Sequence, residues 1–298
     1  MKSLLEQWGG ADKVYISFSG GKDSTVLLDL VRSVYPDIEA VFSNTGLEYP
    51  EIVDFVKTKD NVTIVRPKKS FKQVIEQEGY PVVSKKTSRM INTLQNPNDK
   101  NLRTRKLFMS KFTLDNDGNP TNTPNRYHIL ADKWKYLIDA PFKISNKCCD
   151  ILKKQPLHEY EKNSKKRPIV GTMAYESSLR EKSYLQSGCN IFTKGNEKCN
   201  PLGFWTEQDI LEYIVTHKLQ YASVYGDIIK DENNKWVTTG EKRTGCIFCM
   251  YGIQFEKDIN RFQRLELSHP QLHDYCMNKL GFKQVCEYMN IPYENKKE

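Results

Sequence analysis

The first seventy residues alternate between short apolar runs and longer segments with apolar residues at helical spacing. The runs 14–18 (VYISF), 38–46 (IEAVFSNTG) and 61–67 (NVTIVRP) are rich in β-branched and aromatic residues, as buried strands are. Between them, 25–35 repeats apolar residues every three or four positions, and 50–59 opens with a proline and an acid, which is typical of a first helical turn. This alternation predicts an α/β fold with a doubly wound, mostly parallel sheet.

Two later segments extend this pattern. Residues 168–176 (PIVGTMAYE) predict one more strand followed by a turn. Residues 204–218 (FWTEQDILEYIVTHK) predict an amphipathic helix, whose start Thr206 and Asp209 are spaced to cap. Beyond about residue 225 the sequence becomes irregular and then helical.

The stretch 85–135 differs in composition from its surroundings. It is rich in Asn, Thr and Pro, and it holds eleven basic residues against four acidic ones, a net charge of +7. We expect a basic insertion, partly loop, within an α/β domain that spans 1–225, followed by a C-terminal region over 226–298. With its interspersed aromatic residues, the insertion could grip the phosphates of a tRNA or a DNA, although a solvated basic surface has the same composition.

Composition bears on the ligands and the cellular compartment of the protein. The 45 basic and 37 acidic residues give a net charge of +8, which suits polyanionic ligands but also an ordinary solvated surface. No apolar run reaches the roughly 18 residues of a membrane span, and residues 1–13 hold too little apolar sequence for a signal peptide. We therefore expect a cytoplasmic protein that does not contact membranes and whose eight cysteines are reduced.

The string SFSGGKDST, residues 17–25, lies between a predicted strand and a predicted helix. Adjacent glycines let successive amides face inward, and the start of the helix adds partial positive charge. Lys22 can neutralise a phosphate oxygen and Asp23 can hold Mg²⁺ or cap the helix, so we expect both side chains to face solvent in the absence of a ligand. The spacing of a Walker loop is absent. We predict a phosphate-binding loop made of Ser17, Ser19, Gly20, Gly21, Lys22, Asp23, Ser24 and Thr25.

The motif SGGKDS resembles the pyrophosphatase (PP) loop of the adenine-nucleotide alpha-hydrolase superfamily. Within that superfamily, the chain resembles the phosphoadenosine phosphosulfate reductase family, and most of all the reductase-like proteins of Gram-positive bacteria and their phages. The further segments that agree, in order, are 41–51 (VFSNTGLEYPE), 171–181 (GTMAYESSLRE), 200–214 (NPLGFWTEQDILEYI) and 244–252 (TGCIFCMYG). The resemblance implies the HUP-type α/β fold and ATP or an adenylylated nucleotide, with Mg²⁺, as the ligand.

The resemblance also implies which other residues line the nucleotide. A turn after the second strand lies beside the nucleotide in this family, and here it comprises Asn44, Thr45 and Gly46, with Asn44 at a position where Asp is usual. A second segment would contribute Gly171, Thr172, Glu176 and Ser177. Arg180 is expected to fold over a phosphate or sulfate, which makes Lys22, Asp23 and Arg180 the expected catalytic residues.

Four of the cysteines have the spacing of a metal centre. Cys148 and Cys149 are adjacent, and Cys246 and Cys249 form a CxxC turn flanked by glycines. Adjacent residues at a helix start diverge by about 100°, so their thiols reach two corners of a cluster more easily than one small ion. An iron–sulfur cluster therefore fits better than zinc, which stays an alternative. The family resemblance likewise implies a [4Fe-4S] cluster at these four positions.

The other cysteines suggest no site of their own. Cys286 lies at helical spacing in 280–289 and is expected to be a small core residue, while the roles of Cys189, Cys199 and Cys276 stay open. The tail sequence 284–298 shows no Glu-Cys-Gly motif, which true reductases of this family use as their nucleophile.

Three functions follow from these features. The first is ATP-dependent adenylyl or sulfur transfer to an unidentified acceptor, with a sulfur donor as partner. The second is reduction of adenylylsulfate or phosphoadenylylsulfate, fed by a thioredoxin-like reductant. The third is a nucleotide-binding regulatory or defence protein without turnover. The missing tail motif argues against reduction and so favours adenylyl or sulfur transfer. The intact loop and cysteine motifs argue against a protein that binds nucleotides without turnover.

Overall fold

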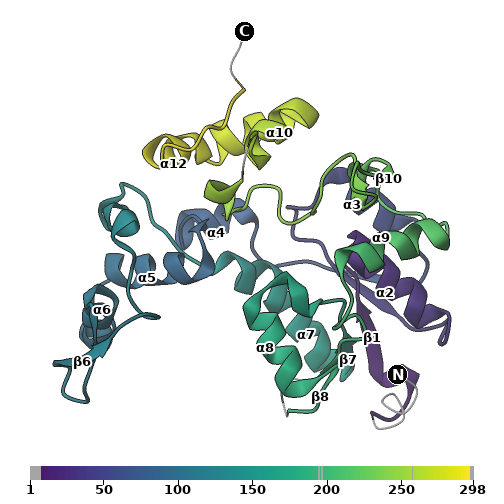
Figure 1. The fold of residues 1–298 in the computed structure, drawn as a ribbon, viewed down its shortest axis with the longest axis horizontal. Coiled ribbons are helices and arrows are strands. Elements are labelled where there is room, and N and C mark those ends of the chain that lie inside the picture. Colours follow the sequence, from purple (N-terminus) through teal and green to yellow (C-terminus); the bar gives the residue numbers. More distant parts are fainter. Residues whose placement is uncertain (1–7, 194, 196, 257, 296–298) are drawn as a thin grey trace. The chain divides into compact units, whose positions relative to one another are not determined.

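The protein is described from a computed structural model, which places residues 8–193, 195, 197–256 and 258–295 (Figure 1). The chain divides into two compact units. The sheet unit comprises Met1–Lys68 and Lys153–Cys246, and the helical unit comprises Lys69–Leu152 and Ile247–Glu298. No helix among the described residues is both long and apolar enough to cross a membrane.

The central sheet of the sheet unit has the strand order β3-β2-β1-β7-β9-β8. Every neighbouring pair from β3 to β9 is parallel, and only β8 runs antiparallel, against β9. The predicted mostly parallel α/β sheet is therefore confirmed. The strands are β1 Val14–Ser17, β2 Ala40–Ser43, β3 Val62–Val65, β7 Arg167–Ile169, β8 Asn190–Ile191 and β9 Lys198–Cys199.

Helices cover both faces of this sheet, with α2 and α9 on one side and α7 on the other (Figure 1). Side chains on both faces of β1 need cover, and the helices supply it: Val14, Tyr15 and Ile16 are all at most 1% exposed. Thr206 and Asp209 form a capping box at the start of α9, as the sequence predicts. The helices are α2 Lys22–Arg32, α3 Pro50–Lys57, α7 Gln155–Ser164, α8 Ser178–Ser187 and α9 Glu207–Thr216, and β10 Ile228–Lys230 and β11 Trp236–Thr238 form a hairpin.

The helical unit is built around an aromatic core in which Phe282 contacts the rings of Phe71, Tyr80 and Phe262. Its helices are α4 Phe71–Gln77, α5 Lys85–Gln95, α6 Leu102–Met109, α10 Arg261–Ser268, α11 Pro270–Asp274 and α12 Phe282–Tyr288. Two small sheets complete it: β4 Val82–Val83 parallel to β12 Met250–Tyr251, and β5 Phe112–Leu114 antiparallel to β6 Pro120–Pro124.

Segments of 3₁₀- and π-helix connect these elements. In the sheet unit they are Ala11–Lys13, Ala174–Glu176 and Ser223–Tyr225, in the helical unit Asp99–Asn101, Asp132–Asp139, Ile253–Phe255 and Tyr275–Lys279, and Asp150–Lys154 spans the boundary. Cys286 lies on α12 with no exposed surface, as expected for a core residue, and burial raises the pKa of its thiol to about 12.

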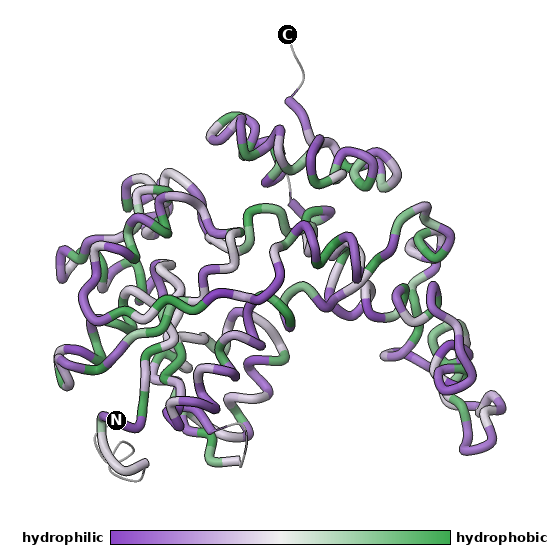
Figure 2. The backbone as a smooth tube through the Cα atoms, turned by 180° about the vertical axis from the view of Figure 1, so that it is seen from behind, coloured by the Kyte–Doolittle hydropathy of each residue, from purple (hydrophilic) through white to green (hydrophobic). Residues whose placement is uncertain are grey.

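The units divide the chain differently from the expected boundary after residue 225. Residues 226–246 belong to the sheet unit, and the basic stretch 85–135 lies wholly inside the helical unit. That stretch is also more regular than a loop, because it forms α5, α6 and the β5–β6 hairpin. In Figure 2 the hairpin is hydrophilic, whereas β1 is hydrophobic.

A partly buried carboxylate joins elements at the amino edge of the central sheet. Glu39, just before β2, accepts hydrogen bonds from Lys166 Nζ at 2.6 Å, Tyr160 Oη at 2.6 Å and Thr63 Oγ1. Burial disfavours its ionised form, but these three donors outweigh burial and hold the pKa of Glu39 below its usual value. The network therefore stabilises the folded state.

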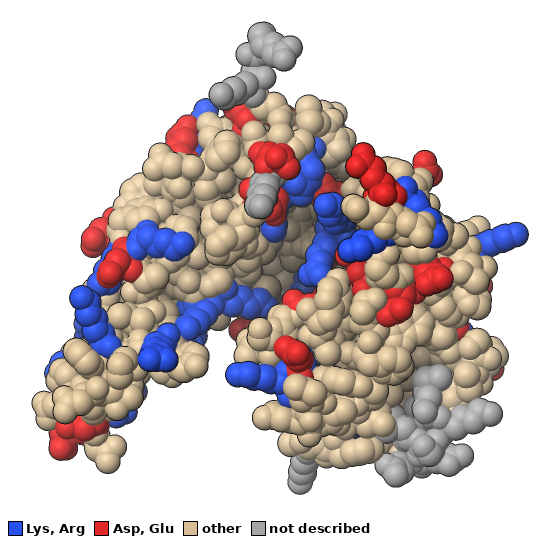
Figure 3. Space-filling view, viewed as in Figure 1, with Lys and Arg blue, Asp and Glu red and all other residues tan. Residues whose placement is uncertain are grey.

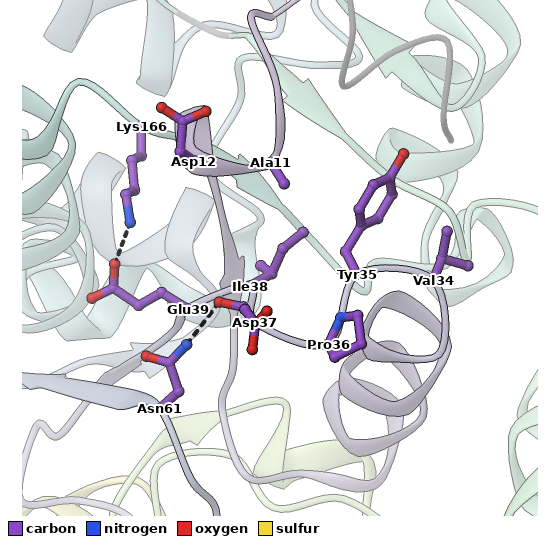
Figure 4. A pocket seen from close by; sticks show the side chains of 10 residues that line it. All are labelled: Ala11, Asp12, Val34, Tyr35, Pro36, Asp37, Ile38, Glu39, Asn61 and Lys166. Carbon is purple, nitrogen blue, oxygen red and sulfur yellow. Dashed lines mark hydrogen bonds and ion pairs between the residues drawn. The ribbon is translucent and has the colours of Figure 1, made fainter.

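A cavity of about 470 Å³ opens beside this network, lined by Asp12, Tyr35, Asp37, Glu39 and Asn61 among others (Figure 4). Its polar groups bond to one another: Lys166 binds Glu39, and Asn61 Nδ2 donates to the Asp37 carbonyl at 2.9 Å. It lies at the amino ends of the strands, whereas open α/β sheets bind ligands beyond the carboxyl ends. We therefore look for the functional site at the opposite edge.

Replacing Glu39 by Gln should lower the free energy of unfolding at pH 7 by about 1–3 kcal/mol, since charge-assisted bonds to Lys166 and Tyr160 are lost. Because the folded pKa of Glu39 lies below its unfolded value of about 4.3, its contribution is present above that pH and is lost as pH falls through the folded pKa. Urea titrations of both proteins between pH 7 and pH 4 should show the difference shrinking at the acidic end.

Asp54→Asn is the matched control, because Asp54 forms an exposed ion pair with Lys57 at 2.8 Å and should change stability by less than about 1 kcal/mol. A Glu39→Gln protein as stable as the wild type at pH 7 would show that the network contributes nothing.

Candidate functional site

The loops that follow β1, β2 and β7 meet at one edge of the central sheet. The three strands are neighbours and parallel, so their carboxyl ends lie together. After β1 the chain continues to β2, which pairs with one side of β1, whereas β7 pairs with the other side. This reversal is a topological switch point, the place where open α/β sheets bind ligands.

The loop after β1 needs glycine at one position for two reasons. Gly20 has φ +73°, and a Cβ there would lie 2.7 Å from Val56 Cγ2 and 2.8 Å from Ile52 Cγ2 on α3. The loop backbone thus rests directly on a neighbouring helix. Gly21 then caps α2 without any side-chain hydrogen bond to the first amides of the helix.

The hydroxyl groups of this loop brace its backbone. Ser24 Oγ and Thr25 Oγ1 donate to the Gly21 carbonyl at 2.9 and 3.0 Å, and Ser24 Oγ accepts the Ser19 amide at 3.2 Å. Ser24 and Thr25 are 6% and 4% exposed. These side chains therefore fix the shape of the loop. The Gly21 amide donates to Ser19 Oγ at 3.4 Å and the Lys22 amide to Tyr225 Oη, so the amides of Gly20 and Asp23 are the candidate donors toward a ligand.

Lys22 does not face solvent, which corrects the expectation from the sequence. The residue is 4% exposed, and its ammonium lies 3.1 Å from Glu207 Oε1 and donates to the Lys242 carbonyl at 2.8 Å. Its amide donates to Tyr225 Oη at 3.1 Å, which in turn lies 2.6 Å from Thr244 Oγ1. The reason is that residues 207–244 of the same unit fold over the start of α2.

Asp23 is also largely buried rather than free in solvent. Burial raises the pKa of its carboxyl group, although Lys22, Arg243 and Arg180 oppose the shift, and Glu207 adds to it. Its Oδ1 is buried and has no hydrogen-bond partner among the described residues. This oxygen lies 3.8 Å from the Lys22 ammonium, too far for a hydrogen bond, and burying a carboxylate oxygen without a hydrogen-bond donor is costly.

Two guanidinium groups converge beside this carboxylate. Glu176 forms ion pairs with Arg180 and, at 3.7 Å, with Arg243, and its Oε2 accepts the Met173 amide at 3.1 Å. Both arginines interact electrostatically with Asp23. The predicted Glu176 and Arg180 thus lie near the loop, and Ser177 caps α8 by accepting the Arg180 amide at 3.3 Å.

The turn after β2 is held by a carboxylate that sequence reasoning missed. Glu48 accepts the Thr45 amide at 2.9 Å and Thr45 Oγ1 at 2.8 Å, while Asn44 Oδ1 accepts the Gly46 amide at 3.1 Å. Gly46 has φ +75°, which a glycine adopts without strain. Asn44 therefore orders this turn, and Glu48 is the nearest acidic group on it.

The segment after β7 approaches the loop through its backbone. A Cβ on Gly171 would lie 3.5 Å from the Asp23 carbonyl oxygen, and the Thr172 amide donates to Asn200 Oδ1 at 3.1 Å. The structure thus brings together the predicted segments 17–25 and 171–180. It adds residues that the sequence did not single out, namely Glu207, Tyr225, Lys242, Arg243 and Thr244. Of these, Glu207 and Thr244 lie in the segments 200–214 and 244–252 that carry the family resemblance, and this is the only sequence signal that pointed to them.

Three of the four candidate cluster cysteines lie in the helical unit. The sulfur atoms of Cys148 and Cys149 are 4.0 Å apart, and Cys249 immediately precedes β12. Cys246 is the last residue of the sheet unit, so the unit boundary falls inside the CxxC turn. Among the described residues, no three ligating side chains are close enough to hold one metal ion.

One side chain near these cysteines bears on what they could bind. Tyr251 has a buried hydroxyl without a hydrogen-bond partner among the described residues. Burial, and then the thiols of Cys148, Cys149 and Cys249, raise its pKa, so all three thiols lie within electrostatic range of it. The nearby Ser88 Oγ is already committed to the Val82 backbone at 2.6 and 3.0 Å.

Comparison with known proteins identifies a family. The model of the phosphoadenosine phosphosulfate reductase domain matches residues 13–96 and 102–250. An uncharacterized protein of Methanocaldococcus jannaschii, MJ0973, is 25% identical over 268 residues, which cover 86% of this chain and 44% of that protein. An adenosine 5'-phosphosulfate reductase of Staphylococcus haemolyticus is 26% identical over 219 residues, covering 72% and 65%. The chain thus spans less than two thirds of the length of these relatives.

A solved structure, the phosphoadenylyl-sulfate reductase from Candida auris in a phosphate complex, is similar over 75% of this chain and 83% of its own, with 14% identity and a TM-score of 0.40. That TM-score is too low to support an inference about this chain. The family model, in contrast, covers most of the chain, including the loop after β1, the turn after β2 and the segment after β7. The chain therefore belongs to the phosphoadenosine phosphosulfate reductase domain family.

Proposed function

We propose that the chain binds ATP or another adenylylated nucleotide at the loop after β1 and transfers the adenylyl group to an acceptor. One observation carries the proposal: the buried Asp23 Oδ1, which lies 3.8 Å from the Lys22 ammonium and has no hydrogen-bond partner among the described residues, lies near three cationic side chains at the switch point of the sheet. Mg²⁺ would neutralise Asp23, and phosphate oxygens would replace Glu207 as the partner of Lys22 and Glu176 as the partner of Arg180 and Arg243.

Each residue has a task in such a transfer. The acceptor oxygen attacks the α-phosphorus, the bond to the bridging oxygen breaks, and the electron pair leaves with pyrophosphate. The amides at the start of α2 and the ammonium of Lys22 stabilise charge that develops on the phosphate oxygens. The Lys22 ammonium donates to the Lys242 carbonyl and lies 3.1 Å from Glu207 Oε1 and 3.8 Å from Asp23 Oδ1, so a phosphate would compete with these groups for its three hydrogens. Arg180 and Arg243 are placed to hold the leaving group.

We further propose that Cys148, Cys149, Cys246 and Cys249 hold a [4Fe-4S] cluster. A [4Fe-4S] cluster would take one thiolate from each of these four cysteines. The unpaired Tyr251 hydroxyl supports a cluster, because cluster sulfur would accept its hydrogen bond. When bound, the cluster would supply electrons or handle sulfur. Zinc is the alternative.

A second candidate is reduction of adenylylsulfate, the activity in the name of the Staphylococcus relative. That reaction needs a nucleophilic thiol. Cys276 and Cys286 do not fit this role, because both are fully buried and burial raises the pKa of each thiol. The third candidate, nucleotide binding without turnover, shares the same site.

Products distinguish the three functions. Anaerobically purified protein is incubated with labelled ATP or adenylylsulfate, with and without a thioredoxin-type reductant. Pyrophosphate and AMP from ATP support adenylyl transfer, and sulfite from adenylylsulfate supports reduction and rejects our proposal. Tight binding without any product would identify a regulator and would also reject it.

Replacing Lys22 by Met together with Glu207 by Gln should weaken ATP binding by about tenfold or more, because a charge-assisted phosphate contact is lost. The double variant avoids leaving Glu207 as an unpaired charge. Isothermal titration calorimetry measures the affinity, and circular dichroism checks the fold. Lys57→Met, which removes an exposed lysine of the same unit, should bind ATP as the wild type does. Equal affinity in the double variant would refute phosphate binding by Lys22.

Replacing Tyr251 by Phe should make the midpoint potential of the cluster more negative, because a hydrogen bond to sulfur stabilises the reduced, more negatively charged form. A redox titration followed by electron paramagnetic resonance measures this potential. Tyr275→Phe is the control, since Tyr275 is 43% exposed in the same unit and should leave the potential unchanged. An unchanged potential in Tyr251→Phe would exclude the hydrogen bond, and a colourless protein that contains zinc would exclude the cluster.

A further inference from the structure

The helical unit exposes three cations and two aromatic rings around α6 and the base of the β5–β6 hairpin. We call this surface the arm patch: Lys106, Lys111, Phe112, Arg126 and Tyr127. All five residues are exposed, and the two rings expose 45% (Phe112) and 75% (Tyr127) of their surface. The patch thus offers both positive charge and aromatic surface to a ligand.

A buried asparagine holds the arm patch in shape. Asn125 is 4% exposed, and its Nδ2 donates to the Leu107 carbonyl at 2.7 Å and the Ser110 carbonyl at 3.0 Å. Its amide donates to the Lys111 carbonyl at 2.8 Å. The end of α6, the start of β5 and the segment 125–127 are thus fixed against one another. The side chains of the patch therefore project from a braced backbone rather than from a free loop.

The cations of the arm patch are not neutralised locally. Among the described residues, no carboxylate forms an ion pair with Lys106, Lys111 or Arg126. Asp132 interacts electrostatically with Lys111, but its ion-pair partner is Lys135, at 2.7 Å. Exposed Lys and Arg side chains continue over α5, which contacts α6 (Figure 3). An excess of unpaired positive charge attracts a polyanion.

The two arginines that stand out most in the sequence have another role. Arg103 donates to the carbonyls of Leu114 and Asp115, and Arg105 donates to Asn101 Oδ1 and the Asn98 carbonyl. These bonds tie α6 to the hairpin and to the preceding turn. A test of ligand binding at Arg103 and Arg105 would therefore disturb the local fold, whereas the arm patch can be altered without breaking such bonds.

We propose that the arm patch binds single-stranded nucleic acid. Its cations would contact the phosphates, and Phe112 and Tyr127 would stack on unpaired bases, which a duplex does not present. Exposed rings between the cations favour a nucleic acid over an acidic protein, because every base has a face on which a ring stacks. The binding stands by itself, and the further role of this nucleic acid as the acceptor rests on the proposed adenylyl transfer.

Fluorescence anisotropy tests the binding without ATP, so its result is independent of the transfer reaction. The probes are a labelled single-stranded RNA, the DNA of the same sequence and the corresponding DNA duplex, each at several salt concentrations. Lys106→Ala with Lys111→Ala and Arg126→Ala should flatten the dependence of log affinity on log salt by about 2, at about 0.7 per lost phosphate contact. Tyr127→Ala should weaken binding at least about fivefold with the slope unchanged.

The control removes the same charge elsewhere: Lys162→Ala with Lys218→Ala and Lys235→Ala changes three exposed lysines of the sheet unit and should keep the wild-type slope. Circular dichroism verifies the fold of each variant. RNA and single-stranded DNA both count as ligands, and their ratio identifies the natural one. No binding at low salt, a preference for the duplex, or an equal loss in the control would overturn the proposal.

Discussion

The buried ammonium of Lys22 is the interaction on which the rest of the sheet unit depends. A charge that is 4% exposed must be paired, and its partners come from Glu207 at the start of α9 and from the backbone of Lys242. Satisfying one residue at the start of α2 therefore requires the segment 207–244 to fold over the loop. The same ammonium lies 3.8 Å from Asp23 Oδ1, at the carboxyl edge of the sheet.

This arrangement stores electrostatic cost at the place where a ligand would relieve it. Asp23 keeps a buried oxygen without a hydrogen-bond donor among the described residues, and burial together with the charge of Arg243 lowers the pKa of the neighbouring Arg180. At the opposite edge, three donors satisfy the partly buried carboxylate of Glu39. The contrast between the two edges of one sheet is the physical reason to place binding at one and stability at the other.

The sequence predicted those features that depend on neighbouring residues. The strands, the glycine-rich loop, the capping box of Thr206 and the core position of Cys286 follow from local patterns, and the structure confirms them. The burial of Lys22 could not be predicted, because its partners lie about 185 to 220 positions away. The division into two units could not be predicted for the same reason, because the chain leaves the sheet unit after Lys68 and returns to it at Lys153. The spacing of four cysteines predicted a metal centre. The structure adds the buried Tyr251 hydroxyl, which has no hydrogen-bond partner among the described residues.

The central claim is that the loop after β1 receives the phosphates of a nucleotide. Amide hydrogen exchange, read by mass spectrometry with and without ATP and Mg²⁺, tests it most directly, because the amides of Gly20 and Asp23 are the proposed donors. The account predicts slower exchange in 18–25 and 44–46 when ATP is present, and no change in the β10–β11 hairpin. Unchanged exchange in the loop at saturating ATP, or protection confined to the cavity beside Glu39, would contradict it.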